Sequence, residues 1–192
     1  ETVCKKGDIW KLGNHRLMCG DSTDAGDMAL LMDIEKADMV FLDPPFDFEF
    51  DIDSVIDYVS ENSTIFLMTC DLFIAKQVVK HSDVFSKLFA VDFRVPNIVS
   101  STSEATRVDI VAKFRVGENK FINKYDAFST LIESFKKHSD KIKQNHGHKQ
   151  AKAVKLPAAF IEHYTNEEEI VLDLFGGSGS TLIAAEQLNR KC

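Results

Sequence analysis

Residues 38–46, Asp-Met-Val-Phe-Leu-Asp-Pro-Pro-Phe, decide the architecture of this 192-residue chain. The apolar run 39–42 is short enough to be a buried parallel strand. It ends at Asp43, and each of the two prolines that follow has a fixed φ and no N–H group. We therefore expect the strand to stop at Asp43 and the chain to leave as a stiff, extended loop with Phe46 at its tip.

This arrangement suits the methylation of an exocyclic amino group on a nucleic-acid base. Such a nitrogen is a poor nucleophile because its lone pair is delocalised into the ring, so a catalyst has to hold both N–H protons. Asp43 can accept one hydrogen bond, and the Pro44 carbonyl, oriented by Pro45, can accept the other. Phe46 can stack on a base that has left its helix. The alternative interpretation is a tight turn after a strand, with Phe46 as a core plug.

A second pattern lies at residues 170–182, Ile-Val-Leu-Asp-Leu-Phe-Gly-Gly-Ser-Gly-Ser-Thr-Leu. It predicts a buried strand, a glycine loop and a helix over 181–189. Glycines let the backbone approach a ligand closely, and the N–H groups of a helix N-terminus favour an anionic group such as a carboxylate. The Gly-Lys-Ser/Thr of a P-loop is absent. A nicotinamide dinucleotide site remains open, although the spacing is not Gly-x-Gly-x-x-Gly.

Strands and helices alternate in the rest of the chain. A hairpin is predicted around Gly13 and Asn14, and residues 22–24 supply a cap for the helix that follows. The segment 47–53 is acidic and aromatic, and we expect it to be exposed and mobile. The pattern predicts an α/β domain with a mostly parallel central sheet and a closing strand pair. The predicted strands are 9–12, 15–19, 64–69, 90–95 and 107–116, and the predicted helices are 25–33, 72–89, 127–137 and 155–164, with a helix turn at 55–59.

Composition indicates one soluble core. The chain is 44% hydrophobic, has no apolar run of roughly 18 residues and shows no signal pattern at its start. Its cysteines are scattered, without a Cys-x-x-Cys pair, which favours a reducing cytosol over a disulfide framework or a zinc site. His146 and His148 are weak evidence for a metal, and we predict none. The cysteines are Cys4, Cys19, Cys70 and Cys192.

The net charge of −7 conceals a basic window. Residues 136–155 contain seven lysines, three histidines and one acid, Asp140, and so carry +6; the other residues therefore carry −13. A solvated surface is one account of such a run. Contact with phosphates is the other, and the residues around Asp43 favour it. The lysines expected to contact nucleic acid are Lys136, Lys137, Lys141, Lys143 and Lys149.

Both patterns resemble one family. Asp-Pro-Pro-Phe is similar to the Asp-Pro-Pro-Tyr signature of amino-methylating DNA methyltransferases that use S-adenosylmethionine, and Phe-Gly-Gly-Ser-Gly is similar to their methionine-binding loop. The catalytic motif precedes the cofactor loop, as in the permuted β class of that family. Residues 7–21 resemble the start of many phage and bacterial members. The resemblance implies a Rossmann-like class I methyltransferase fold in circularly permuted order, and it covers residues 7–192.

The resemblance assigns roles to individual residues, at positions where ligands bind open parallel sheets. It implies that Asp21 lies against the adenine of the cofactor. Considered without the resemblance, Asp21 is better explained as a helix cap. Lys152 belongs to a segment on the cofactor side. The residues implied in catalysis are Asp43, Pro44, Pro45 and Phe46, and those implied in cofactor binding are Asp21, Lys152, Asp173, Phe175, Gly176, Gly177, Ser178 and Gly179.

The sequence departs from the family pattern at several points. Phe46 replaces tyrosine and loses a hydroxyl, and Ala153 replaces the proline that usually follows Lys152. Residues 117–150 are too few for an independent recognition domain, so we expect a single domain over 1–192. Recognition of a DNA sequence is then relaxed or absent, or it is supplied by another domain or another chain. That other chain can be a second copy in a homodimer. The acidic residue that binds the cofactor ribose is expected on a strand after residue 192, so we expect a fragment.

These observations predict a DNA methyltransferase that is specific for adenine N6, of the bacterial or phage restriction-modification type. The family associates Asp at the first motif position with adenine and Ser with cytosine N4. The cofactor is S-adenosylmethionine and the partner is DNA, with the target base flipped out. Cytosine N4 or RNA amino-methylation is the alternative within the class. A catalytically silent domain that binds cofactor or nucleic acid is the alternative outside it.

Overall fold

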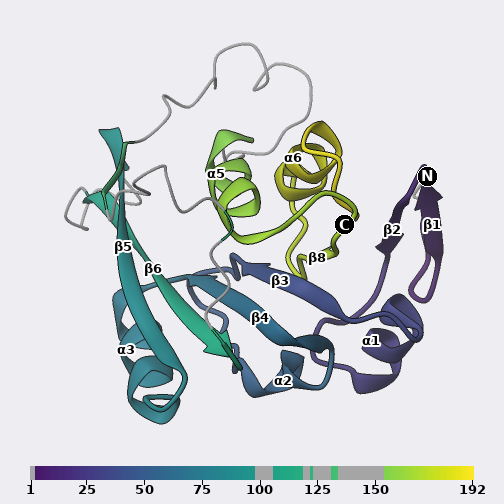
Figure 1. The fold of residues 1–192 in the computed structure, drawn as a ribbon, viewed down its shortest axis with the longest axis horizontal. Coiled ribbons are helices and arrows are strands. Elements are labelled where there is room, and N and C mark those ends of the chain that lie inside the picture. Colours follow the sequence, from purple (N-terminus) through teal and green to yellow (C-terminus); the bar gives the residue numbers. More distant parts are fainter. Residues whose placement is uncertain (1–2, 98–105, 119–121, 123–130, 134–153) are drawn as a thin grey trace.

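The structure is a computed structural model that describes residues 3–97, 106–118, 122, 131–133 and 154–192. Two strands form a separate hairpin, and the other strands form one sheet with helices on both faces (Figure 1). The strands are β1 (Ile9–Leu12), β2 (His15–Met18), β3 (Ala37–Leu42), β4 (Val59–Met68), β5 (Phe85–Asn97), β6 (Thr106–Val116), β7 (Leu131–Glu133) and β8 (Val171–Leu172). The helices are α1 (Ala25–Met32), α2 (Asp53–Ile56), α3 (Asp71–Lys80), α5 (Lys155–Tyr164) and α6 (Ser180–Gln187).

Six strands are hydrogen-bonded in the order β7-β5-β6-β4-β3-β8. β3 is parallel to both β4 and β8, and β5 is parallel to β7. β6 is antiparallel to β4 and to β5, so it opposes the other described strands of this sheet. The prediction of a mostly parallel sheet with one antiparallel strand is confirmed, but that strand, β6, lies inside the sheet between β5 and β4 rather than closing it.

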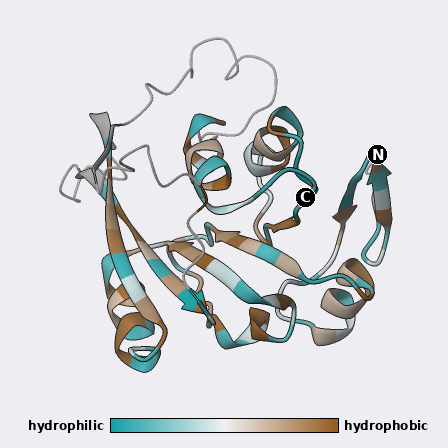
Figure 2. Cartoon of the chain, viewed as in Figure 1, coloured by the Kyte–Doolittle hydropathy of each residue, from teal (hydrophilic) through white to brown (hydrophobic). Residues whose placement is uncertain are grey.

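β3 occupies the interior of the sheet because its side chains are apolar on both faces. Val40 and Leu42 pack into the core on one face, and Met39 and Phe41 pack into the core on the other. Figure 2 shows hydrophobic residues on much of β3 and of its neighbour β4. A strand buried on both faces needs hydrogen-bonding partners on both edges, and β4 and β8 provide them.

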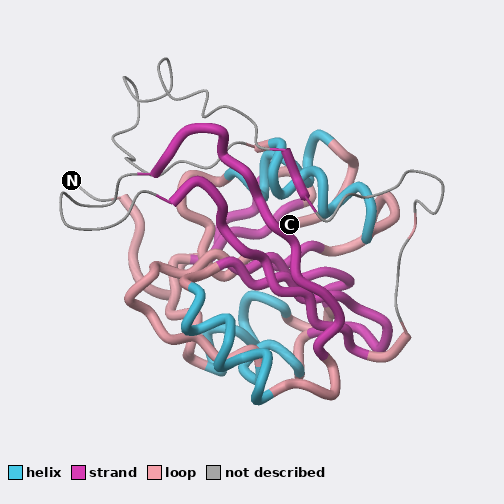
Figure 3. Tube along the Cα trace, turned by 90° about the vertical axis from the view of Figure 1, so that its left-hand side faces the viewer, coloured by secondary structure: helices cyan, strands magenta, loops and turns pink. Residues whose placement is uncertain are grey.

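The helices form a layer on each side of the sheet, which is clear when the sheet is turned (Figure 3). α1, α2 and α3 contribute Met28, Val55 and Ile74 to the core on one face. α5 and α6 contribute Phe160 and Ala184 to the core on the other. The predicted helices 25–33, 155–164 and 181–189 are confirmed with small shifts of their ends. Figure 1 shows α5 and α6 above β3 and β8, where they flank the loops that leave these strands.

The predicted hairpin is also confirmed, and it stands apart from the main sheet (Figure 1). His15 joins it to α6, with 2.7 Å between its Nε2 and Oε2 of Glu186. The Cys192 N–H donates to His15 Nδ1 at 3.0 Å, and the Arg16 N–H donates to the Cys192 carbonyl at 2.9 Å. The hairpin is therefore held against the C-terminal residues across a cavity described below.

The predicted helix over 72–89 is wrong in its second half. α3 ends at Lys80, and residues from Phe85 onward form β5. Phe85 pairs with Phe114, and Phe89 pairs with Val111. The apolar positions in this stretch fit a helical face as well as a strand face. Backbone pairing with β6, which no local pattern reveals, decides in favour of the strand.

The predicted helix over 127–137 is contradicted where the structure describes it. Leu131–Glu133 is β7, which pairs in parallel with Ala90, Val91 and Asp92 of β5. The rest of the predicted helix lies outside the described residues. Here too the edge of an existing sheet offers hydrogen bonds that outweigh a weak local preference for helix.

Among the described helices, none combines the length and the apolar character that crossing a bilayer requires. The four cysteines are free thiols.

Candidate active site

Two loops meet at one edge of the sheet because β3 and β8 are parallel neighbours. Their register pairs Met39 with Val171 and Val40 with Leu172. Parallel strands end at the same edge, so the residue after each strand lies near the residue after the other. Asp43 follows β3, and Asp173 follows β8. The two carboxylates are close enough for the charge of Asp43 to influence the titration of Asp173.

A small cavity of about 60 Å³ connects these two loops. It contains Asp43 from the loop after β3 and the glycine loop after β8, together with the first turn of α5 and the start of α6. The glycine loop continues directly into α6, but Asp43 lies 130 positions before Asp173 in the sequence, so only the fold brings it to this cavity. The lining residues are Phe41, Asp43, Leu156, Pro157, Asp173, Phe175, Gly176, Gly177, Ser178, Ser180 and Thr181.

Asp173 is held in place at the base of the glycine loop. The Phe175 N–H donates to its Oδ1 at 2.8 Å, and the Thr181 side chain makes a further hydrogen bond with its carboxyl group. Burial raises the pKa of Asp173, the two hydrogen bonds oppose this rise, and the negative charge of Asp43 adds to it. The pair of carboxylates is therefore a place where a cationic ligand would be stabilised.

We expect Asp173→Asn to increase thermal stability at pH 7. A carboxyl group whose pKa is higher in the folded state binds more protons there than in the unfolded chain, where its pKa is about 3.9. The free energy of unfolding therefore decreases as the pH rises from about 4 to the pKa of Asp173 in the folded protein. Above that pKa this contribution does not change further. Asn keeps the acceptor for the Phe175 N–H and removes the charge, so the unfolding midpoint should rise and its fall with pH should weaken.

Thermal unfolding followed by circular dichroism at several pH values measures both effects. Asp47→Asn, at an exposed carboxylate in the same loop as Asp43, is the matched control and should change neither. An Asp173→Asn protein that melts at or below the wild-type temperature at pH 7 would contradict the expectation.

The glycine loop adopts backbone conformations that side chains rarely tolerate. Gly177 has φ of +50° and Gly179 has φ of +78°. Gly179 is also the residue that caps the N-terminus of α6, and its own N–H donates to the Gly176 carbonyl at 2.7 Å. A Cβ on Gly176 would meet no atom within 4 Å, so this position is open to a ligand rather than packed.

A larger cavity of about 580 Å³ lies on the other side of the glycine loop. Asp173, Gly176, Gly177 and Ser178 line both cavities. The rest of the larger wall is mostly apolar and comes from the hairpin, α1, β8 and α6. Those residues are Leu12, Asn14, Arg16, Leu17, Met18, Leu31, Met32, Glu35, Ile170, Val171, Leu172, Gly179, Leu182, Ile183, Lys191 and Cys192.

The loop after β3 presents its aromatic tip to solvent. Pro44 is buried, whereas Pro45 is exposed and Phe46 is 38% exposed. The Phe48 N–H donates to the Pro45 carbonyl at 2.9 Å, so a turn follows the two prolines. The interpretation of Phe46 as a core plug is therefore wrong, and its ring is accessible to a ligand.

Comparison with known proteins agrees with this geometry. Residues 119–192 match the family model described as DNA methylase of the N6/N4 type. A 43-residue stretch is 51% identical to the type II methyltransferase M.HindIII of Haemophilus influenzae. This part of the chain therefore resembles DNA methylases of the N6/N4 type. The stretch covers 22% of this chain and 14% of M.HindIII, so the chain spans a small part of that relative's length.

Solved structures share the fold of this chain. M1.HpyAVI in complex with SAM aligns with a TM-score of 0.65 at 20% identity, over 83% of this chain and 82% of that one. PvuII DNA methyltransferase, which is cytosine-N4-specific, aligns with a TM-score of 0.64 at 16% identity, over 85% of this chain and 77% of that one. The predicted class I methyltransferase fold is confirmed.

Asp21 lines neither the small nor the larger cavity. Its Oδ1 accepts hydrogen bonds from the Thr23 N–H at 2.9 Å and from the Thr23 hydroxyl at 2.7 Å. These bonds lower the pKa of Asp21. The helix-cap alternative for Asp21 is wrong, because Asp24 caps α1 by accepting from the Asp27 N–H at 2.8 Å.

Other predicted residues of the domain lie outside the part that the structure describes. These are Lys152 and Ala153 near α5, the histidines His146 and His148, and the basic residues Lys136, Lys137, Lys141, Lys143 and Lys149. Their roles remain predictions.

Sequence analysis did not single out Leu156 and Pro157 as residues of the site. Both are in the first turn of α5 and line the small cavity opposite the glycine loop. A proline is tolerated in the first turn of a helix because its missing N–H is not needed there, and Pro157 occupies that position in α5. The only signal for a role at the site is that this turn closely follows Lys152 in the sequence.

The segment 47–53 is exposed only in part: Asp47, Phe48, Glu49 and Asp53 are exposed as predicted, whereas two of its apolar residues are buried. Phe50 is 4% exposed and Ile52 is fully buried. The ring centroids of Phe48 and Phe50 lie 5.8 Å and 5.2 Å from that of Phe175. The loop after β3 is thus in direct contact with the first residue of the glycine loop. The alternation of aromatic and acidic residues was the available signal for one buried and one polar face.

Proposed function

We propose that this chain transfers a methyl group from S-adenosylmethionine to the exocyclic amino group of a DNA base, at adenine N6. One observation carries the proposal: Asp43 and the glycine loop 176–178 line the same small cavity, and that loop also lines a much larger apolar cavity. An acceptor for an amino group and a wall for a cofactor are therefore adjacent. The N6/N4 methylase family match supports the same reaction.

The residues present suit S-adenosylmethionine. The N-terminal N–H groups of α6 favour a carboxylate, and the two open glycine conformations leave room for it beside the backbone. Asp43 and Asp173 favour positive charge, which the ammonium and sulfonium groups of this cofactor carry. The larger cavity, with Leu17, Leu31 and Ile183 in its wall, suits the nucleoside. Asp21 and Lys152 stay proposed contacts on the resemblance to the family.

The cofactor supplies an electrophilic methyl group, and the chain supplies position and hydrogen-bond acceptors. In the proposed reaction the Asp43 carboxylate and the Pro44 carbonyl accept hydrogen bonds from the two amino protons. The nitrogen lone pair is then free to attack. A carbon–nitrogen bond would form as the carbon–sulfur bond breaks and the neutral thioether S-adenosylhomocysteine leaves, and the nitrogen would pass one proton through Asp43 to solvent. Phe46 stacks on the flipped base, and Pro45 keeps the loop rigid. Orientation of this kind supplies much of the acceleration in such reactions.

The target is proposed as adenine because Asp43 occupies the first position of the motif. The chain is proposed to act as a single domain on DNA in the cytoplasm of a bacterium or an infected cell. The basic segment 136–155 would contact phosphates, through Lys136, Lys137, Lys141, Lys143 and Lys149. A homodimer or another chain would add sequence recognition.

The test is transfer of the methyl group from labelled S-adenosylmethionine to DNA, followed by nucleoside analysis of the product. We expect N6-methyladenine. If the product is N4-methylcytosine, the proposed reaction stands but the target base is cytosine. If the label appears only in RNA, the substrate is RNA and not DNA. Calorimetric titration with the cofactor comes first. Binding without transfer to any nucleic acid would favour a catalytically silent domain, and no binding would overturn the proposal.

A further inference from the structure

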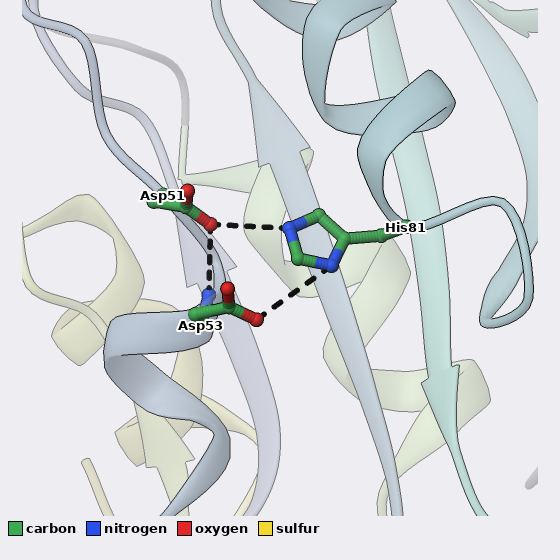
Figure 4. A group of neighbouring side chains, drawn as sticks. All are labelled: Asp51, Asp53 and His81. Atoms are coloured by element: carbon green, nitrogen blue, oxygen red, sulfur yellow. Dashed lines mark hydrogen bonds and ion pairs between the residues drawn. The ribbon is translucent and has the colours of Figure 1, made fainter.

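Four side chains, two carboxylates, a lysine and a histidine, fasten the segment 47–53 to the end of α3. We call Asp51, Asp53, Lys80 and His81 the acidic clasp, of which Figure 4 shows Asp51, Asp53 and His81. Lys80 Nζ forms ion pairs with both carboxylates, with a distance of 2.7 Å to Asp53 Oδ2. His81 Nε2 lies 3.1 Å from Asp51 Oδ1, and His81 Nδ1 lies 3.7 Å from Asp53 Oδ1.

The clasp also includes a backbone contact. The Ile52 N–H donates to Oε1 of the buried Gln77 at 3.2 Å, one turn before the end of α3. The Asp53 N–H donates to Asp51 Oδ1 at 3.1 Å, which orients the Asp51 carboxylate toward the helix. Charged contacts and two backbone hydrogen bonds therefore fix a segment that has no pairing of its own in the sheet.

The clasp is better explained as an ion-pair network than as a metal site. Asp51, Asp53 and His81 have ligand atoms close enough together to hold a cation. Lys80 already places its ammonium between the two carboxylates, so a metal ion would have to displace it. Burial alone would raise the pKa of Asp51, but the hydrogen bonds from Lys80, the Asp53 backbone and His81 outweigh it and lower that pKa.

The opposite face of the same segment reaches the glycine loop. Phe50 and Ile52 are buried, whereas Asp53 is exposed and Asp51 is half-buried, so these two apolar side chains turn inward. Phe50 meets the Phe175 ring edge-on, with an interplanar angle of 88°, and Phe48 meets it at 64°. Phe175 is followed directly by Gly176 and Gly177. The segment that carries the clasp thus contacts the glycine loop through the aromatic rings of Phe48, Phe50 and Phe175.

We propose that the acidic clasp positions the glycine loop for the cofactor, with Asp51 and Lys80 as positioning residues that act through Phe50 and Phe175. This inference rests on the proposed function, since it assigns the clasp a role in cofactor affinity. When the clasp is intact, the segment 47–53 presses its aromatic face against Phe175. When it is broken, the segment keeps its covalent link to Asp43 but loses the fixed position of Phe48 and Phe50.

The test compares Lys80→Met with Lys76→Met. Lys76 lies one turn earlier on α3 and pairs with the exposed Glu49 at 2.8 Å, so its replacement removes a similar ion pair from the same segment without touching the clasp. We expect Lys80→Met to weaken S-adenosylmethionine binding at least tenfold by calorimetry, and Lys76→Met to leave it within twofold. Lys80→Arg, which retains the charge, should restore most of the affinity.

Hydrogen exchange provides a readout that does not need the cofactor. The amides of Phe175 and Gly179 are protected by hydrogen bonds to Asp173 Oδ1 and the Gly176 carbonyl. In Lys80→Met both should exchange at least tenfold faster, whereas a purely local role of the clasp would speed exchange only in 47–53 and α3. If Lys80→Met does not fold, Asp51→Asn replaces it with the same expectations.

The two proposals fail in different ways. A wild-type protein that does not bind S-adenosylmethionine overturns the proposed function, and exchange at Phe175 and Gly179 still decides the coupling. Cofactor binding by the wild type and by Lys80→Met with equal affinity, or unchanged exchange in the glycine loop, overturns the positioning role alone.

Discussion

The Asp43→Ala protein should lose methyl transfer to DNA almost completely while it still binds S-adenosylmethionine. Asp43 follows β3 at the mouth of the small cavity and is the proposed acceptor for one amino proton. Loss of one preorganised hydrogen-bonding partner in a catalytic site lowers kcat by about 10²–10³-fold. Cofactor affinity should fall only modestly, because Asp173 still faces the positive charge of the cofactor and Asp43 acts mainly on the target base.

Removal of the Asp43 charge also affects Asp173 in the glycine loop. The charge of Asp43 contributes to the raised pKa of Asp173, so its removal makes the carboxyl group of Asp173 easier to ionise. Asp43→Ala should therefore not destabilise the glycine loop, and Asp43→Asn should behave in the same way. Single-turnover methyl transfer, measured beside a calorimetric titration, separates the two effects.

The matched control is Asp47→Ala, which removes an exposed carboxylate four residues further along the same loop. It should keep its transfer rate within a few-fold of wild type. Wild-type turnover by Asp43→Ala would remove Asp43 from the reaction.

The second large effect is expected for Gly177→Asp, which should abolish measurable binding of S-adenosylmethionine. Gly177 lines both cavities beside Asp173 and has φ of +50°. Aspartate would add a third carboxylate next to Asp43 and Asp173, and would occupy the space where the carboxylate of the cofactor is proposed to lie. We expect affinity to fall by at least 100-fold.

Gly177→Asn separates charge from shape. Asn tolerates a left-handed backbone about as well as Asp, so the two variants share the same conformational cost and nearly the same volume. A Cβ at this position meets only the Phe175 carbonyl, at 3.6 Å, so neither variant should unfold. The Asn variant should bind more tightly than the Asp variant.

Gly7→Asp places the same substitution at another positive φ, with open space around it and outside both cavities. Its affinity should match that of wild type. A Gly177→Asp protein with wild-type affinity would show that the cofactor binds elsewhere.

Local sequence was sufficient to predict an element when the residues of that element alone restrict its conformation. The run before Asp43 is apolar at every position, and only a strand buried on both faces satisfies it. Gly176, Gly177 and Gly179 permit a loop that few other residues can form, and the structure shows positive φ at two of them. Pro157 could be placed in a first helical turn because its missing N–H costs nothing there.

Local sequence was misleading where hydrogen bonds or contacts come from distant residues. Phe85 and Phe89 fit a helix face, but β6 offers them strand partners. The acids of 47–53 suggested a solvated segment, but Lys80 and His81, which balance them, lie almost thirty residues away. Composition counts charges and cannot show which of them are paired.

The sequence by itself determined the class of fold and the two motifs that point to amino-methylation, because apolar runs, prolines and glycines restrict the backbone wherever they occur. Only the tertiary structure decided that Asp43 and Asp173 share a cavity, that the glycine loop separates two cavities, and that Phe50 joins the clasp to Phe175. The physical reason is that burial, pairing and the pKa of a buried carboxyl group depend on neighbours in space. The parallel register of β3 and β8 selects those neighbours.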